Sequence, residues 1–142
     1  MTLEAVNLIF GETDCELSIA LVKRSEIIRI NETFLQHEGA TDVITFDYSD
    51  KPLSAEIVIC LDEAFSQARS FGTTWQSELA RYVVHGLLHL KGYDDHTATA
   101  RRKMKQVEQK LLTQLAHRFD LKRLSSKKNF LLPHLSRVRS RS

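Results

Sequence analysis

The sequence predicts an α+β domain of mixed α/β character, in which a small sheet packs with helices. Several segments repeat apolar residues at helical spacing, and three short segments are apolar or alternating and rich in β-branched residues. The order is helix, strand, helix, two strands and three helices, which does not alternate regularly. A chain of 142 residues that is 42% apolar is about one domain and can bury a core.

Capping residues and turn residues delimit the expected elements. Ser25, Asp62 and Thr97 are candidate N-caps, Gly92 is a helix stop, and Asp50-Lys51-Pro52 is typical of a turn. The expected elements are, in order, a short helix over 3–10, a strand over 15–22, a helix over 25–37, strands over 42–48 and 55–61, a helix over 62–70, a strongly apolar helix over 76–91 and a last helix over 97–117.

Charge divides the chain into two parts. Residues 118–142 carry eight basic side chains and one acid, a net charge of +7, so residues 1–117 carry −5 of the total of +2. We expect one folded domain over 1–118 and a basic, disordered tail over 119–142. Such a tail can attract phosphates without regard to sequence, or it can be solvated with no partner, and the sequence leaves both interpretations open.

The sequence contains no membrane or export signal that we recognise. No run of 18 apolar residues is present, so we expect no transmembrane helix. The N-terminal segment MTLEAVNLIF lacks the basic start and long apolar stretch of a signal peptide. The two cysteines, Cys15 and Cys60, form no motif, which fits a reducing compartment. We therefore expect a cytoplasmic protein with no membrane partner.

The segment HGLLHLKGYDDH, residues 85–96, is the strongest candidate for a functional site. His85 and His89 are four residues apart on an expected helix, so they project from the same face one turn apart. Gly92 lets the chain turn back, which can bring Asp95 or His96 to the same ion. Imidazole and carboxylate are zinc ligands, and three protein ligands leave a fourth position for water, as in catalytic zinc sites.

Two other interpretations of this segment remain open. A bare His-x-x-x-His pair is often a packed, hydrogen-bonded part of a core, but the glycine and the additional His and Asp that follow favour metal binding. The spacing is similar to the zincin motif of metalloproteases, but Gly86 stands where those proteases have a glutamate as general base. Because that proton acceptor is missing, the sequence points to a reaction other than peptide hydrolysis.

Three segments together resemble the YbeY family of bacterial endoribonucleases. VVHGLLHLKGYDDH is similar to the family signature H-G-x-L-H-L-x-G-Y-D-H, INETFLQHEGATDVITFDY to a second motif, and AEIVICLDEAFSQA to a strand followed by a helix. The resemblance covers about residues 15–115. It implies a zinc ion (Zn²⁺) on three ligands and a single-strand-specific endoribonuclease in rRNA 3′-end maturation and ribosome quality control. Its expected partners are rRNA and the small ribosomal subunit, with no DNA.

The chain departs from the family pattern at three places. The position of the family's third histidine is Asp95, with His96 one residue later, so the third ligand is left as His96 or Asp95. The family's arginine after L-N-x-x-Y, inside its second motif, aligns with Leu35. His37 is then either a catalytic donor or proton carrier, or an exposed helix-end histidine. The region before residue 15 is shorter than in the family, so we expect a missing first strand or a misassigned start.

Three functions from different classes follow. The first is a metal-dependent endoribonuclease with His37, His85 and His89 as catalytic residues and one zinc ion, although imidazoles also hold nickel or copper. The second is another zinc-dependent hydrolase, a divergent protease or a phosphoesterase. The third is a ribosome-associated module in which the metal is structural.

Overall fold

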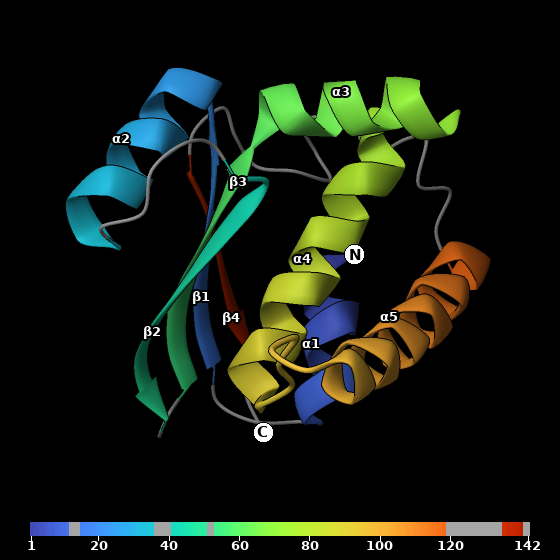
Figure 1. Ribbon diagram of the computed structural model, residues 1–142. Helices are drawn as coiled ribbons and strands as arrows, with labels where there is room; N and C mark the ends of the chain where they lie inside the picture. The colour runs from blue at the N-terminus through green and yellow to red at the C-terminus, as the bar shows by residue number, and fades with distance from the viewer. Residues whose placement is uncertain (12–14, 36–40, 51–52, 119–134, 141–142) are drawn as a thin grey trace.

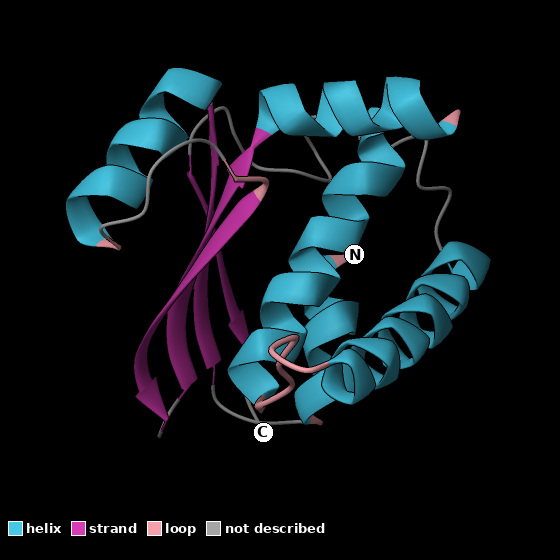
Figure 2. Ribbon diagram, viewed as in Figure 1, coloured by secondary structure: helices cyan, strands magenta, loops and turns pink. Residues whose placement is uncertain are grey.

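The computed structural model describes residues 1–11, 15–35, 41–50, 53–118 and 135–140. Within these ranges the chain forms five helices and a four-stranded sheet, an α+β fold as the sequence predicts (Figures 1 and 2). The elements are α1 (Thr2–Phe10), β1 (Cys15–Val22), α2 (Arg24–Phe34), β2 (Val43–Asp50), β3 (Leu53–Cys60), α3 (Leu61–Phe71), α4 (Trp75–Lys91), α5 (Ala98–Arg118) and β4 (Leu135–Ser140).

The sheet is mixed and has the strand order β2-β3-β1-β4. Strand β1 pairs parallel with β3, with Ile19 opposite Ile57, while β2 is antiparallel to β3. The register of β2 shifts between Asp47 and Ser49, as at a β-bulge. Parallel pairing of β1 and β3 requires a crossover, which α2 and β2 supply between them.

The helices cover the two faces of the sheet unequally. Figure 1 shows α4 and α1 on one side of the sheet and α2 on the other. The larger core lies on the α4 side, where Leu17, Ile57 and Leu87 are fully buried. A smaller cluster packs α2 against the opposite face through Ile27 and Val58. Burial of α4 between the sheet and α5 makes it the central helix of the domain.

Helix α4 begins and ends on local signals. The side chain of Thr74 accepts a hydrogen bond from the Ser77 N–H at 3.2 Å and so caps the N-terminus. At the other end Gly92 has a φ of 112°, and its N–H donates to the carbonyl of His89 while the N–H of Tyr93 donates to that of Leu88. This is a Schellman motif, which favours glycine because of the left-handed backbone.

Two predicted caps are wrong and one is confirmed. The N-cap of α2 is Lys23 rather than Ser25, and the Arg24 N–H donates to the carboxylate of Asp62 at 2.8 Å. Asp62 lies inside the first turn of α3 and so caps the neighbouring helix instead of its own. Thr97 does cap α5, since its hydroxyl accepts from the Ala100 N–H at 3.0 Å. The N-terminus of α2 is therefore capped by the carboxylate of Asp62, which is distant in sequence, and not by the hydroxyl of Ser25.

Only part of the segment for which we expected a disordered tail is described. Residues 119–134 and 141–142 lie outside the described residues, and residues 135–140 form β4, antiparallel to β1. Pairing with β4 satisfies backbone groups on the edge of β1 that would otherwise face solvent. In the described part of the chain, no helix combines the length and apolar character needed to cross a membrane.

Candidate metal centre

The last turns of α4 and the loop after it bring His85, His89 and Asp95 together. One ligand atom from each residue lies within 4.8 Å of the others. The Nε2 atoms of the two histidines are 3.1 Å apart, and their rings meet edge to face with centroids 4.7 Å apart. The group therefore combines two imidazoles from one helix face with a carboxylate from the loop.

The spacing of these atoms fits a small divalent cation. Zinc bonds imidazole nitrogen at about 2.0–2.1 Å in a tetrahedral shell, which places two nitrogen ligands about 3.3–3.4 Å apart. The observed separation of 3.1 Å between the Nε2 atoms is close to this value. A carboxylate oxygen is an accepted third ligand for zinc. The donor set of two imidazoles and one carboxylate can thus hold one cation and leave a position for solvent.

Glu108 on α5 fixes the orientation of the His85 ring. Its Oε2 lies 2.9 Å from Nδ1 of His85. A carboxylate only accepts hydrogen bonds, so Nδ1–H is the donor, and in the neutral ring Nε2 carries the lone pair. The hydrogen bond with Glu108 raises the pKa of His85 above its usual value, while burial opposes this. Such carboxylate–histidine pairs hold metal-binding imidazoles in the correct tautomer.

Glu108 is itself held by a polar network in which its carboxylate and that of Glu78 are buried and the Arg81 side chain is partly exposed. Only 6% of Glu108 and 4% of Glu78 is exposed, and Arg81 lies between the two carboxylates. Its Nη1 is 3.1 Å from Glu108 Oε1 and its Nε is 3.4 Å from Glu78 Oε2. The Thr73 hydroxyl donates to Glu78 at 3.2 Å. Partners of this kind are required because an unpaired buried carboxylate is costly.

Close packing against the sheet explains the glycine between the two histidines. A Cβ at Gly86 would lie 2.9 Å from Ile57 Cδ1 and 3.1 Å from Thr45 Oγ1. Ile57 is fully buried, so a longer side chain at residue 86 has no free space to enter. A Cβ at residue 86 therefore requires the Ile57 side chain or α4 to shift, and the longer side chain of a glutamate requires a larger shift.

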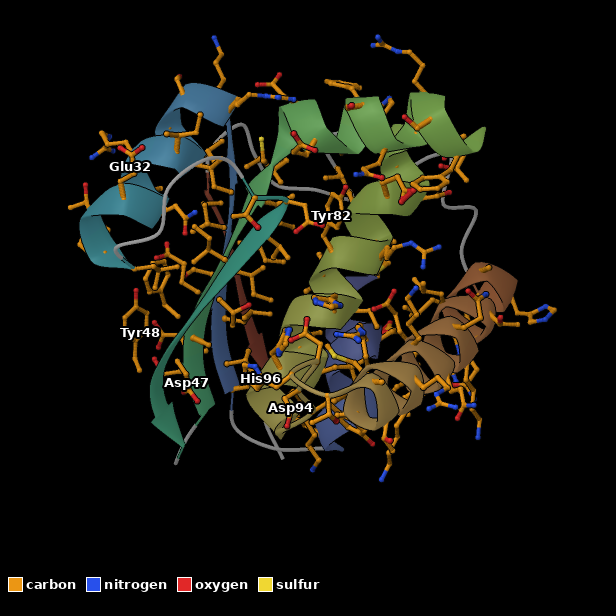
Figure 3. All side chains as sticks on the ribbon, viewed as in Figure 1. Glu32, Asp47, Tyr48, Tyr82, Asp94 and His96 are labelled. Carbon is orange, nitrogen blue, oxygen red and sulfur yellow. The ribbon has the colours of Figure 1, made fainter. Side chains whose placement is uncertain are left out.

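The structure places the two candidates for the third ligand differently. Asp95 belongs to the group with His85 and His89. Nη1 of Arg101 donates to the backbone carbonyl of Asp95 at 3.2 Å, which ties the loop to the start of α5. His96, labelled in Figure 3, is exposed in the same loop. It is not part of that group, and its N–H donates to Asp94 at 3.1 Å.

The third residue proposed for catalysis has no described position. His37 lies in the segment 36–40, outside the described residues. Leu35, which aligns with the family's arginine, is 39% exposed just after α2. The described residues at the candidate centre are therefore those from α4, the loop and α5.

Asp42, which lies just before β2, acts electrostatically on the same region. Its charge raises the pKa of His85 together with Glu108 and Asp95. It also adds to the effect of burial, which raises the pKa of Tyr82 well above its usual value. Tyr82 is 4% exposed on α4, and among the described residues its hydroxyl has no hydrogen-bond partner. The start of β2 thus contributes negative charge near the candidate centre.

The sequence analysis did not identify Glu108, Arg81 or Glu78. One signal for Glu108 was available: it occupies the apolar face of α5, between the buried Met104 and Leu111. A charged residue in such a stripe is rarely buried without a partner. The identity of that partner depended on how α5 packs against α4, which the sequence does not show.

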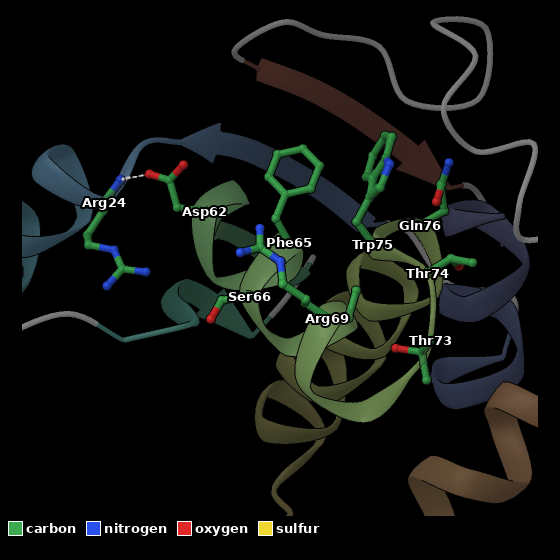
Figure 4. Close-up of a pocket in the computed structure, with 10 residues that line it drawn as sticks. Arg24, Asp62, Phe65, Ser66, Arg69, Thr73, Thr74, Trp75 and Gln76 are labelled. Atoms are coloured by element: carbon green, nitrogen blue, oxygen red, sulfur yellow. Dashed lines mark hydrogen bonds between the residues drawn. The ribbon is translucent and has the colours of Figure 1, made fainter.

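A hollow lies at the N-terminal end of α4, opposite the end that carries the candidate metal centre (Figure 4). It has a volume of about 650 Å³, and its lining includes Arg24, Arg69, Phe65 and Trp75. The ring centroids of Phe65 and Trp75 are 5.5 Å apart. Fourteen residues of helix separate Trp75 from His89, which corresponds to about 20 Å at 1.5 Å per residue. This hollow is therefore separate from the candidate metal centre.

The fold and the site define a class of protein: an α+β domain with a candidate three-ligand metal centre on one helix and the loop after it. A family model described as "Endoribonuclease YbeY" matches residues 2–116, most of the chain. The chain belongs to the YbeY family.

Curated relatives and a solved structure agree with this family. Proteins named endoribonuclease YbeY are 40% identical over 104 residues in Myxococcus xanthus and 46% identical over 88 residues in Chlorobium luteolum. These matches cover 68% and 61% of this chain but only 35% and 64% of the relatives, so the chain spans less than two thirds of either. A solution structure from Thermotoga maritima is 31% identical, with a TM-score of 0.57, over 77% of this chain and 72% of the other.

Proposed function

We propose that this protein is a metal-dependent endoribonuclease that hydrolyses phosphodiester bonds in single-stranded RNA. The observation that carries the proposal is the convergence of His85, His89 and Asp95 within 4.8 Å of one another, with Glu108 orienting His85. The name of the matched family supports RNA as the substrate. We further propose rRNA, undergoing 3′-end maturation in the cytoplasm on the small ribosomal subunit, as the physiological target.

The proposed ligands of the cation are His85, His89 and Asp95, with His96 as the alternative to Asp95. Zinc is the metal we propose, because two imidazoles and one carboxylate are a common zinc donor set. A zinc ion bound there supplies Lewis-acid catalysis for phosphodiester hydrolysis and makes water a nucleophile near neutral pH.

The protein's own residues hold and orient the reacting groups. Glu108 keeps the Nδ1 proton on His85, so that Nε2 stays available as a ligand. Arg81 and Glu78 hold Glu108 in place from the side away from His85. Arg101 donates a hydrogen bond to the backbone carbonyl of Asp95 and so restrains the loop that carries Asp95. His37 and Asp42 are candidates to orient the substrate or carry a proton.

The contact around Gly86 argues against the divergent protease. In zincins a glutamate beside the first histidine accepts the proton from water. Here a Cβ at residue 86 already meets Ile57 at 2.9 Å, so a general base from that position does not fit. A phosphoesterase of small substrates and a module with a structural metal remain the alternatives that an experiment has to separate.

The experiment combines metal analysis with RNA cleavage. The full chain is purified, its bound metal is measured, and single-stranded and duplex RNA are offered to the wild type, His89→Ala and a matched control, His117→Ala, whose histidine is exposed on α5. The proposal expects about one metal per chain and cleavage of single strands, both lost in His89→Ala and kept in His117→Ala. Bound metal without any RNA cleavage contradicts the nuclease and favours the structural metal.

A test in cells addresses the finer proposal. Replacement of the gene by the His89→Ala variant should leave rRNA with unprocessed 3′ ends, whereas the His117→Ala variant should restore normal ends. Normal rRNA ends in the His89→Ala strain, at equal protein levels, contradict the role in rRNA maturation.

A further inference from the structure

A second hollow lies beside the loop that carries Asp95. Its volume is about 390 Å³. It is lined from one side by the last residue of α4 and the loop after it, and from the other side by the first two turns of α5. The lining residues are Lys91, Gly92, Tyr93, Asp94, Ala100 and Lys103.

The hollow contains two cations and one acid. Lys91 and Lys103 are both exposed and come from different helices. Lys91 Nζ lies 5.5 Å from the centroid of the Phe10 ring, a cation–π contact that restrains its side chain. The acid is Asp94, labelled in Figure 3, and its carboxylate accepts a hydrogen bond from the His96 N–H. The hollow therefore has a net positive charge.

The start of α5 is basic, although the N-terminus of a helix favours negatively charged side chains. Its first turn holds no acidic residue, and Arg101, Arg102, Lys103 and Lys105 follow one another closely before the first acid, Glu108. Cations near a helix N-terminus oppose the helix dipole, which prefers negative charge there. These basic residues add to the positive charge around the hollow, and an anionic ligand bound there would offset this charge.

We propose that Lys91 and Lys103 form a subsite for the RNA backbone, which holds a phosphate next to the one that is cleaved. This proposal rests on the proposed function, because it names how the substrate of that same centre is held. Lys91 is two residues from His89 along the chain, so the subsite and the centre lie on the same end of α4. The ammonium group of lysine is a point charge, unlike the planar guanidinium of arginine, which makes two directed hydrogen bonds. A point charge suits phosphate contacts that do not depend on base sequence.

The experiment measures RNA affinity as a function of salt. A fluorescent single-stranded RNA is titrated with the zinc-loaded full chain by anisotropy, and a gel checks that the RNA stays intact during the measurement. The variants are Lys91→Ala, Lys103→Ala and the double variant. Lys23→Ala is the matched control, since Lys23 is an exposed lysine at the N-cap of α2. The double Lys→Arg variant tests whether charge alone is sufficient.

Each phosphate contact adds about 0.7 to the slope of log affinity against log salt for single strands. We expect each alanine variant to lose about fivefold in affinity at 0.1 M salt and the double variant about 25-fold, with a slope smaller by about 1.4. Lys23→Ala and the Lys→Arg variant should bind as the wild type does. An unchanged thermal midpoint shows that the variants are folded.

Three outcomes overturn the subsite. One is a double variant with the affinity and slope of Lys23→Ala. Another is loss of affinity in the Lys→Arg variant as well, which assigns the effect to packing. A third is competition by inorganic phosphate at the same concentration of phosphate groups as RNA, which assigns the hollow to a free anion. If the double variant loses RNA binding while the wild type cleaves no RNA, the subsite stands and the proposed activity fails.

Discussion

Glu108 on α5 holds His85 on α4 through a 2.9 Å contact between Oε2 and Nδ1, across 23 residues of sequence. This contact joins the packing of two helices to the orientation of a candidate metal ligand. It also gives a reason for burying a carboxylate that would otherwise cost free energy. The first prediction follows from it.

Glu108→Gln should weaken zinc binding by about 10- to 100-fold, which is the usual cost of losing the partner of a metal-binding histidine. The neutral amide no longer stabilises the Nδ1–H form of His85 as a carboxylate does. The measurement is a competition titration against a zinc chelator. Glu32→Gln, at an exposed position on α2 (Figure 3), is the control and should bind zinc normally. Equal affinities in both variants contradict the role of Glu108.

Asp95→Asn should reduce zinc affinity more than His96→Ala does. Asp95 belongs to the group formed with His85 and His89, whereas His96 is exposed outside it. An amide oxygen is a weaker ligand than a carboxylate because it carries no net charge. The same chelator competition decides the question. If His96→Ala lowers the affinity more than Asp95→Asn, the third ligand is His96 and the loop rearranges on binding.

Gly86→Glu should strongly destabilise the folded protein. Its side chain would enter the contact with Ile57 and Thr45 and bury a carboxylate, which costs several kcal/mol out of a typical total of about 5–15 kcal/mol. Gly86→Ala is milder, because overpacking costs about 1–3 kcal/mol and helix propensity returns about 1 kcal/mol. Urea denaturation measures both. Gln114→Glu, exposed on α5, is the control for adding a carboxylate to a helix. A stable Gly86→Glu variant contradicts the close packing.

Both thiols should be unreactive in the folded protein. Cys15 is 2% exposed and Cys60 is fully buried, and burial raises the pKa of each thiol. A raised pKa means less thiolate at a given pH, and the thiolate is the reactive form. At pH 8 a disulfide reagent should label the native protein at least about 100-fold more slowly than the urea-unfolded protein. Labelling of either thiol at the unfolded rate contradicts this burial.

Local signals made much of the fold predictable. The repeat of apolar residues and the stop at Gly92 predict most of α4, although its N-cap Thr74 was not predicted, and the His-x-x-x-His pair lies on one face because helix geometry requires it. The sequence could therefore predict that His85 and His89 converge, and the structure brings their Nε2 atoms to 3.1 Å.

Features that depend on tertiary packing could not be predicted. The N-terminus of α2 uses Asp62, 38 residues away, rather than Ser25. Glu108 finds His85 only because α5 folds back against α4. The pairing of β4 with β1 likewise joins distant segments, and a short polar segment carries little periodic signal of its own. Each of these contacts joins residues that are distant in sequence, so it depends on how the helices and strands pack together in the folded protein.

Anomalous X-ray scattering at the zinc absorption edge, from crystals of the full chain grown with zinc, tests the central claim most directly. The account predicts one anomalous peak about 2.0–2.2 Å from Nε2 of His85, Nε2 of His89 and a carboxylate oxygen of Asp95, with a further position open to solvent. A zinc-bound chain whose peak lies away from His85 and His89, or whose ion has four protein ligands, contradicts the proposed catalytic metal centre.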